Sequence, residues 1–177
     1  FSPSYLLSRR RGFDIRSFGS GNAGATNMML AAGLKPGLTV MALDVSKAFL
    51  VTFPLRLLLP PLCAALAGLF CVLGHIFPVF LHFRGGKGTA CLCGTVLGLT
   101  PELVLPLLAV MFIIGMIWNR ASILPLLTAL VYAPLYLLRT GDWRSTAALA
   151  LIFPAMLWAH RKNFARWREG KEQTFRQ

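Results

Sequence analysis

The chain has 177 residues, of which 56% are hydrophobic, and its 18 lysines and arginines against 6 acidic residues give a formal net charge of +12. Soluble domains are about 45–50% apolar, so this composition argues against an ordinary soluble protein. The basic residues lie between apolar runs and form no stripe with aromatic residues. This pattern favours cytoplasmic loops and anionic lipid as their surroundings, and no nucleic-acid partner is expected.

Long apolar segments determine the predicted fold. A helix needs roughly 20 apolar residues to span a bilayer, and five segments approach that length: residues 38–59, 62–83, 102–118, 122–138 and 146–160. Residues 88–100 are shorter and are expected to form a short or tilted helix inside the bundle. Because lipid offers no hydrogen-bond partners to the backbone, every segment must be helical. We predict an all-α, polytopic integral membrane helical bundle, with residues 1–177 forming a single domain.

The basic residues indicate an orientation in the membrane. Arg56, Arg139 and Arg144 fall on one side, Lys47 lies within a helix, and the other 14 of the 18 lysines and arginines fall on the opposite side. By the positive-inside rule, the side with 14 basic residues is cytoplasmic. The count is this uneven only if residues 88–100 cross the membrane.

Three polar segments are predicted to lie on the cytoplasmic side: GSGNAGATN (19–27), GHIFPVFLHFRGGKGTA (74–90) and HRKNFARW (160–167). Glycine-rich turns can point successive N–H groups into one concavity that binds phosphate, and a helix N-terminus adds further donors. RGGKG (84–88) places Lys87 within such a turn, although it is not a P-loop. Each segment alone could be a tight turn at the membrane surface with a snorkelling lysine. Three on one face favour anion binding.

Several titratable residues leave a structural and a functional interpretation open. His160, Asn163 and Trp167 share one helical face; Trp167 is expected to anchor the interface, whereas His160 is either an interfacial residue or part of a site. Asp44 and Lys47 are three residues apart within an apolar helix, where charges normally pair and often mark function. His75 and His82 are interpreted as polar residues at helix ends, with a role in the site as the alternative.

The sequence offers no protein nucleophile and no metal site. The four cysteines, Cys63, Cys71, Cys91 and Cys93, lie inside apolar segments and are interpreted as small core residues. Cys91 and Cys93 have the wrong spacing for zinc, and no cluster of histidines and carboxylates accompanies them. No H-x-x-x-x-D motif follows any histidine, and no Ser-His-Asp order is suggested. An enzyme with this sequence would act on a substrate that is already activated.

At this point a family resemblance is visible. GSGNAGATN, LDVSK (43–47), GHIFPVFLHFRGGKG and HRKN resemble, in order and spacing, the bacterial acyl-phosphate:glycerol-3-phosphate acyltransferase family over nearly the whole chain. The resemblance implies a seven-helix, multi-pass enzyme of the bacterial cytoplasmic (inner) membrane, with most of its first helix missing here and its active site on the cytoplasmic side. It implies transfer of an acyl group from acyl phosphate to glycerol 3-phosphate, giving lysophosphatidic acid and phosphate, with no cofactor and no metal. The bilayer and an enzyme that produces acyl phosphate are the implied partners.

The resemblance also assigns roles to residues. Ser20 would donate a hydrogen bond to substrate, Lys87 would hold phosphate, and His160 and Asn163 would orient glycerol 3-phosphate or its attacking hydroxyl. Further substrate-binding positions are Gly19, Gly21, Asn22, Thr26, Asn27, Gly85, Gly86, Gly88 and Arg161. Asp44, Lys47 and His75 are supporting candidates.

Three positions depart from the family pattern. Leu30 stands where the family usually has an arginine that helps bind a substrate phosphate, Lys162 replaces the acid of HREN, and Ala48 replaces the glycine of LDxxKG. These departures keep two alternatives open. One is an anion transporter, since broken helices also bind anions there. The other is an inactive or re-specialised paralogue that acts as a partner of lipid-synthesis enzymes.

Overall fold

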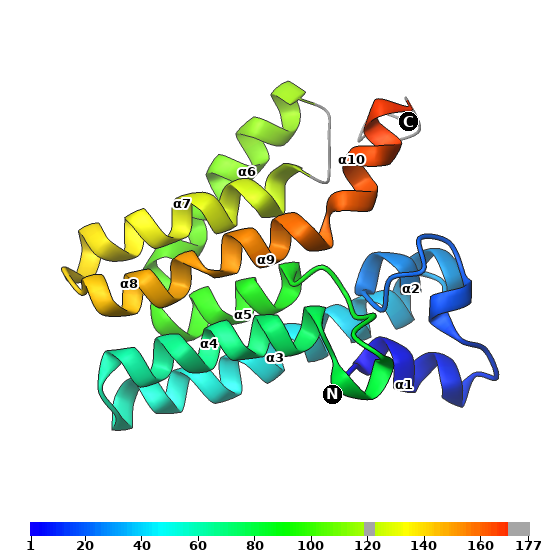
Figure 1. Ribbon diagram of the computed structural model, residues 1–177, viewed down its shortest axis with the longest axis horizontal. Coiled ribbons are helices and arrows are strands. Elements are labelled where there is room, and N and C mark those ends of the chain that lie inside the picture. The colour runs from blue at the N-terminus through cyan, green and yellow to red at the C-terminus, as the bar shows by residue number, and fades with distance from the viewer. Residues whose placement is uncertain (119–122, 170–177) are drawn as a thin grey trace.

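The computed structural model describes residues 1–118 and 123–169, and within these ranges all regular structure is helical (Figure 1). The α-helices are α1 (Pro3–Arg10), α2 (Ala25–Ala32), α3 (Leu34–Leu58), α4 (Pro61–Ile76), α5 (Thr89–Leu99), α6 (Val104–Trp118), α7 (Ile123–Thr140), α8 (Trp143–Ala150), α9 (Ile152–Ala159) and α10 (Arg161–Arg168). Short 3-10 turns cover Ile15–Ser17, Val79–Leu81 and Pro101–Leu103. The all-α prediction is confirmed, and each predicted span corresponds to a helix or to the pair α8 and α9.

Three helical segments are long and apolar enough to cross a membrane by length and composition: Leu34–Leu58, Pro61–Leu81 and Ile123–Thr140. Their outward faces carry large apolar side chains. Leu50, Phe70 and Leu138, one from each segment, are 66%, 63% and 83% exposed. Apolar surface of this extent on long helices fits contact with lipid acyl chains rather than water.

A proline accounts for the break between α8 and α9. Pro154 lies near the start of α9 and has no N–H, so it cannot donate to the carbonyl four residues earlier, at Ala150. α8 ends at Ala150, and Leu151 donates instead to Ala148 in a tighter turn, with an N–O distance of 3.2 Å. The predicted segment 146–160 is therefore one apolar stretch divided into two short helices.

Helices α3, α4 and α5 pack closely together, because small residues let their backbones approach. A Cβ atom at Gly94 would collide with the Val45 carbonyl oxygen, and one at Gly98 would collide with the Thr52 hydroxyl. A Cβ at Gly68 of α4 would lie 2.5 Å from Thr95. The short predicted helix is therefore held inside the bundle, as expected.

The order of these contacts gives the direction of α5. Gly94 and Gly98 meet Val45 and Thr52 in the same order along both helices, so α5 runs parallel to α3. Beyond its end, Thr100 lies 3.1 Å from the Tyr132 hydroxyl, and Glu102 pairs with Arg139 at 3.2 Å. Residues 88–100 thus lead toward the end that contains Arg139, which is the direction that the charge distribution requires.

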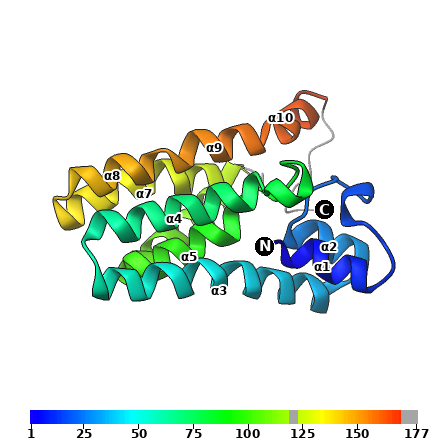
Figure 2. The same cartoon turned by 60° about the horizontal axis from the view of Figure 1, so that its bottom comes forward.

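The two ends of the bundle differ in character. At one end lie the α3–α4 and α7–α8 connections, and at the other lie α1, α2, α10 and the loop between α4 and α5 (Figures 1 and 2). This second end contains all three polar segments. The fold therefore gathers on one end the residues that the sequence separates by more than a hundred positions.

Candidate functional site

A cavity of about 460 Å³ opens between α2, α3, α5 and α10. All three polar segments contribute to its lining. The predicted site residues that line it are Gly19, Ser20, Asn22, Thr26, Asn27, Asp44, His75, Lys87, Gly88 and Asn163. Six other predicted positions do not line it: Gly21, Lys47, Gly85, Gly86, His160 and Arg161.

Asn27 organises the first wall of the cavity from within. Its side chain is 2% exposed and accepts a hydrogen bond from the Ser20 N–H at 3.0 Å. Its amide nitrogen lies 3.0 Å from each of three carbonyl oxygens, those of Ile15, Phe18 and Asn22. An amide with this many partners holds the shape of the loop that lines the cavity.

Within this loop, the Ser20 hydroxyl accepts a hydrogen bond from the Asn22 side chain at 3.3 Å, which leaves its own proton available to a ligand in the cavity. Gly21 adopts a φ of 70°, and its N–H donates to the Phe18 carbonyl at 2.9 Å. That glycine therefore turns the chain and does not supply a donor to the cavity.

The segment before the loop is anchored by an ion pair. Asp14 accepts hydrogen bonds from the backbone N–H of Arg16 at 2.9 Å and from its guanidinium at 2.7 Å. The side-chain hydrogen bond from Arg16 is the main cause that lowers the pKa of Asp14 to about 2. The carboxylate is therefore ionised at neutral pH and caps the 3-10 turn that leads into the loop.

Two helices point their N-termini into the cavity. Gly24 precedes α2 and Gly88 precedes α5, and the first two residues of each helix also line the cavity. The first N–H groups of a helix have no acceptor within it, and the helix dipole makes this end favourable for an anion. Gly88 has a φ of 88°, a conformation that glycine adopts without strain. Lys87, which directly precedes it, adds a cation at the same place.

Gly85 and Gly86 do not line the cavity, and their N–H groups have partners within the protein. The Gly85 N–H donates to the Ile76 carbonyl at 3.2 Å, and the Gly86 N–H donates to the His75 carbonyl at 3.1 Å. These bonds satisfy carbonyls at the end of α4, which a helix leaves without internal partners. In this segment the first turn of α5, at Thr89 and Ala90, lines the cavity instead.

The third segment is arranged differently from the prediction. His160 is 1% exposed, and its Nδ1 lies 2.8 Å from the Met156 carbonyl oxygen, so the ring packs back into α9. The Arg161 guanidinium donates to the Trp158 carbonyl at 2.9 Å and lies 3.5 Å above the Trp158 ring. Neither residue lines the cavity.

Arg166 is the site residue that the sequence reasoning missed. It lines the cavity together with Asn163, one helical turn before it. The spacing of three residues places both side chains on one face of α10, and this signal could have identified Arg166. Arg166 and Lys87 give the cavity two cationic residues from different elements.

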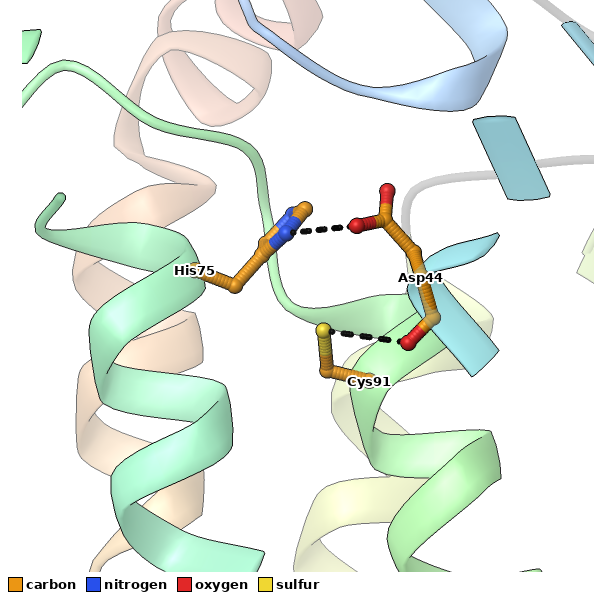
Figure 3. A group of neighbouring side chains, drawn as sticks. All are labelled: Asp44, His75 and Cys91. Carbon is orange, nitrogen blue, oxygen red and sulfur yellow. Dashed lines mark hydrogen bonds and ion pairs between the residues drawn. The ribbon is translucent and has the colours of Figure 1, made fainter. Parts of the chain in front are cut away.

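Two residues that line the cavity, Asp44 and His75, belong to a buried polar cluster. Asp44, His75 and Cys91 come together from α3, α4 and α5 (Figure 3), and their ligand atoms lie within 4.8 Å of one another. The Lys47 Nζ lies 2.5 Å from Asp44 Oδ1 and 3.0 Å from His75 Nδ1. The lysine ammonium thus takes the place that a metal ion would need beside these two residues.

Other cavity residues are less polar. Cys93, which the sequence analysis interpreted as a small core residue, lines the cavity, and Leu30 and Met41 line it as well. Leu30 brings an apolar side chain where a cation was expected. Ala48 is fully buried, and a Cβ at Gly94 would lie 3.0 Å from it, whereas Lys162 is exposed on α10. Of the three departures, only Leu30 reaches the cavity.

Comparisons with known proteins agree on one family. The family model described as glycerol-3-phosphate acyltransferase matches residues 1–170. A glycerol-3-phosphate acyltransferase of Rhizobium etli is 36% identical over 168 residues, which cover 94% of this chain and 81% of that protein. One of Coxiella burnetii is 38% identical over 160 residues, covering 90% and 82%.

Two solved structures share the fold. Both are crystal structures of PlsY, described as an integral membrane glycerol 3-phosphate acyltransferase, and both are 28% identical to this chain. The glycerol 3-phosphate form has a TM-score of 0.88 and covers 98% of this chain and 88% of its own. The lysophosphatidic acid form has a TM-score of 0.84, with coverage of 97% and 87%.

Proposed function

We propose, from the premise that the chain belongs to the glycerol-3-phosphate acyltransferase family, that it transfers a fatty acyl group from acyl phosphate to glycerol 3-phosphate. The products are lysophosphatidic acid and inorganic phosphate. The observation that carries this proposal is the cavity in which two helix N-termini meet Lys87 and Arg166. Family membership favours this enzyme over the transporter and the non-catalytic partner.

The cavity suits two phosphate-bearing substrates. Its volume of about 460 Å³ falls in the usual range for small-molecule sites, roughly 300–1,000 Å³. Lys87 and the first turn of α5 hold one phosphate group. Arg166, Asn163 and the first turn of α2 lie in the same cavity and hold the second, with the Ser20 hydroxyl as an additional donor.

The reaction needs no nucleophile from the protein. The glycerol 3-phosphate hydroxyl oxygen attacks the acyl carbon, and the bond from that carbon to the bridging phosphate oxygen breaks. The phosphate leaves with the bonding electrons, and one of its oxygens takes the hydroxyl proton. Acyl phosphate is a mixed anhydride with a good leaving group, so positioning and stabilisation of negative charge supply the catalysis.

The site lies at the membrane surface. The cavity is at the end of the bundle that carries most of the basic residues, which the positive-inside rule places in the cytoplasm, here of a bacterium with this enzyme in its inner membrane. The acyl chain stays in the lipid while the phosphate groups react at the interface. An enzyme that makes acyl phosphate from an activated fatty acid must supply the donor.

The experiment measures acyl transfer from palmitoyl phosphate to labelled glycerol 3-phosphate by the protein in lipid vesicles. We expect product from the wild type and a fall of about 100-fold or more in kcat/KM for the Lys87→Ala variant, because a cation that holds a substrate phosphate is removed. The Lys162→Ala variant removes an exposed cation of α10 outside the cavity and keeps wild-type activity. Full activity of Lys87→Ala, or movement of substrate across the vesicle membrane without conversion, would overturn the proposal.

A further inference from the structure

Gly85 and Gly86, in the loop between α4 and α5, donate their N–H groups to carbonyls within the protein, and their close contacts explain why glycine stands at both positions. Gly86 lies against the edge of the His75 ring. A Cβ atom there would collide with His75 Nε2 and lie 2.8 Å and 3.0 Å from the adjacent ring carbons Cε1 and Cδ2. Only glycine allows the backbone to rest directly on this ring.

The ring beneath Gly86 is held in one orientation. His75 Nδ1 lies 3.0 Å from Lys47 Nζ and 3.3 Å from Asp44 Oδ1, and these two groups pair with each other at 2.5 Å. Asp44 is 1% exposed and His75 is 6% exposed. A buried carboxylate is costly unless it is paired, and the pairing of Asp44 with Lys47 holds the adjacent His75 ring in one preferred arrangement.

We propose that the Asp44–Lys47–His75 cluster is a positioning device, in which the His75 ring is the seat for Gly86 and thereby sets where Lys87 enters the cavity. Lys87 directly follows Gly86, and both Lys87 and His75 line the cavity. Lys47 does not line it, so Lys47 acts on substrate only through its neighbours. The inference rests on the proposed function, because holding Lys87 in place matters only if Lys87 binds phosphate.

Gly85 provides a matched control within the same loop. A Cβ there would collide with the His75 carbonyl oxygen and lie 2.5 Å from the Pro78 ring and 2.8 Å from the Ile76 carbonyl oxygen. Gly86 is thus opposed by the His75 side chain, whereas Gly85 is opposed by backbone and proline. Removing the imidazole makes room for a methyl group at position 86 and makes none at position 85.

The test compares five proteins: Gly86→Ala, Gly85→Ala, His75→Ala, and His75→Ala combined with each glycine variant. We expect Gly86→Ala to lower kcat/KM by about tenfold or more and to lower the unfolding temperature. In the His75→Ala background, the same change costs nothing further in either quantity, because contacting residues are not additive. Gly85→Ala remains equally damaging in both backgrounds.

A role beyond stability is read from the kinetics of His75→Ala. A misplaced Lys87 weakens substrate binding, so KM for a phosphate-bearing substrate rises about tenfold while kcat per folded protein changes less. His75→Gln, whose side chain still reaches toward Gly86, keeps KM closer to that of the wild type. An unchanged KM in His75→Ala would reduce the cluster to a purely structural element and overturn the positioning role.

The outcomes separate this inference from the proposed function. If the protein is not an acyltransferase, no variant has activity, yet His75→Ala still relieves the loss of unfolding temperature caused by Gly86→Ala. If the seat is wrong, the wild type is active, and the Gly86→Ala defect persists in the His75→Ala background or is absent altogether. Should Gly86→Ala alone fail to fold, a folded double variant supports the seat and an unfolded one overturns it.

Discussion

Glycine has different roles in two regions of this molecule. In the middle of the bundle, Gly94 and Gly98 let α5 approach α3, and every nearby backbone group belongs to a regular helix. At the cavity end, Gly24 and Gly88 precede helices whose first N–H groups open into the cavity. Close packing in the bundle provides stability, whereas the glycines at the cavity end lead into helix N-termini, whose first N–H groups have no acceptor within their own helix.

The largest expected effect lies at the cavity end. Arg166→Ala removes a cation from the cavity and lowers kcat/KM by about 100-fold or more, while the unfolding temperature stays close to that of the wild type. Arg168→Ala, an exposed arginine two residues later, is the matched control and keeps full activity. Kinetics and thermal unfolding of both variants in detergent check this prediction, and equal activity in the two variants would remove Arg166 from the site.

The next effect belongs to the bundle. Gly98→Ala forces a methyl group against the Thr52 hydroxyl and, at 3.1 Å, against the Phe53 backbone nitrogen. We expect the free energy of unfolding to fall by about 1–3 kcal/mol, as in other overpacked cores. Gly74→Ala meets no atom within 4 Å and lies inside α4, so it is neutral or stabilising by about 0.5–1 kcal/mol. A similar fall in the free energy of unfolding for both variants would contradict the expected difference between Gly98, which is closely packed, and Gly74, which is not.

A smaller effect depends on pH. Because Arg16 lowers the pKa of Asp14 from 3.8 to about 2, the folded state binds this proton less readily than the unfolded chain. The stability from this ion pair is complete above pH 4 and is lost as the pH falls toward 2. Unfolding temperatures of the wild type and Asp14→Asn should differ at pH 7 and converge at pH 2. The pKa of Asp142 is also lowered, by its hydrogen bond with Ser145, but Asp142 is present in both proteins, so its effect on stability cancels in the comparison.

The smallest expected effect is at Cys93. Although its thiol lines the cavity, acyl phosphate needs no protein nucleophile, so Cys93→Ala should change kcat by less than about threefold. Steady-state kinetics and mass spectrometry of the wild type with palmitoyl phosphate check this. A large loss of activity, or an acylated Cys93 peptide, would indicate a covalent intermediate.

Much of the cavity was predictable from short-range patterns. The segment GSGNAGATN predicted a polar loop, and Ser20 and Asn22 of this segment line the cavity. The sequence could not show that the Asn27 amide would donate hydrogen bonds to the carbonyls of Ile15 and Phe18. RGGKG predicted a lysine at a helix start, which Lys87 provides. In each case the residue type indicated polarity and turning, while the partners came from other segments.

The third segment shows the limit most clearly. Arg161 and Arg166 both follow His160 on one short basic helix, and composition does not distinguish them. Packing distinguishes them. The Arg161 guanidinium lies over the Trp158 ring, whereas the helix face that carries Asn163 and Arg166 lines the cavity. The rotation of α10 about its axis depends on the space that α9 and the neighbouring loops leave for its side chains.

By itself, the sequence determined that this protein is a bundle of apolar helices, which end carries the positive charge, and which family its motifs resemble. These properties depend on local apolar length and residue order, which hydrogen bonding within a helix translates directly into structure. Only the tertiary structure decided that the N–H groups of Gly85 and Gly86 donate to the last carbonyls of α4. It also decided that Arg166 rather than Arg161 lines the cavity, and that Lys47 contacts both Asp44 and His75. Each of those outcomes depends on which backbone or side-chain group the packed helices bring within hydrogen-bond distance.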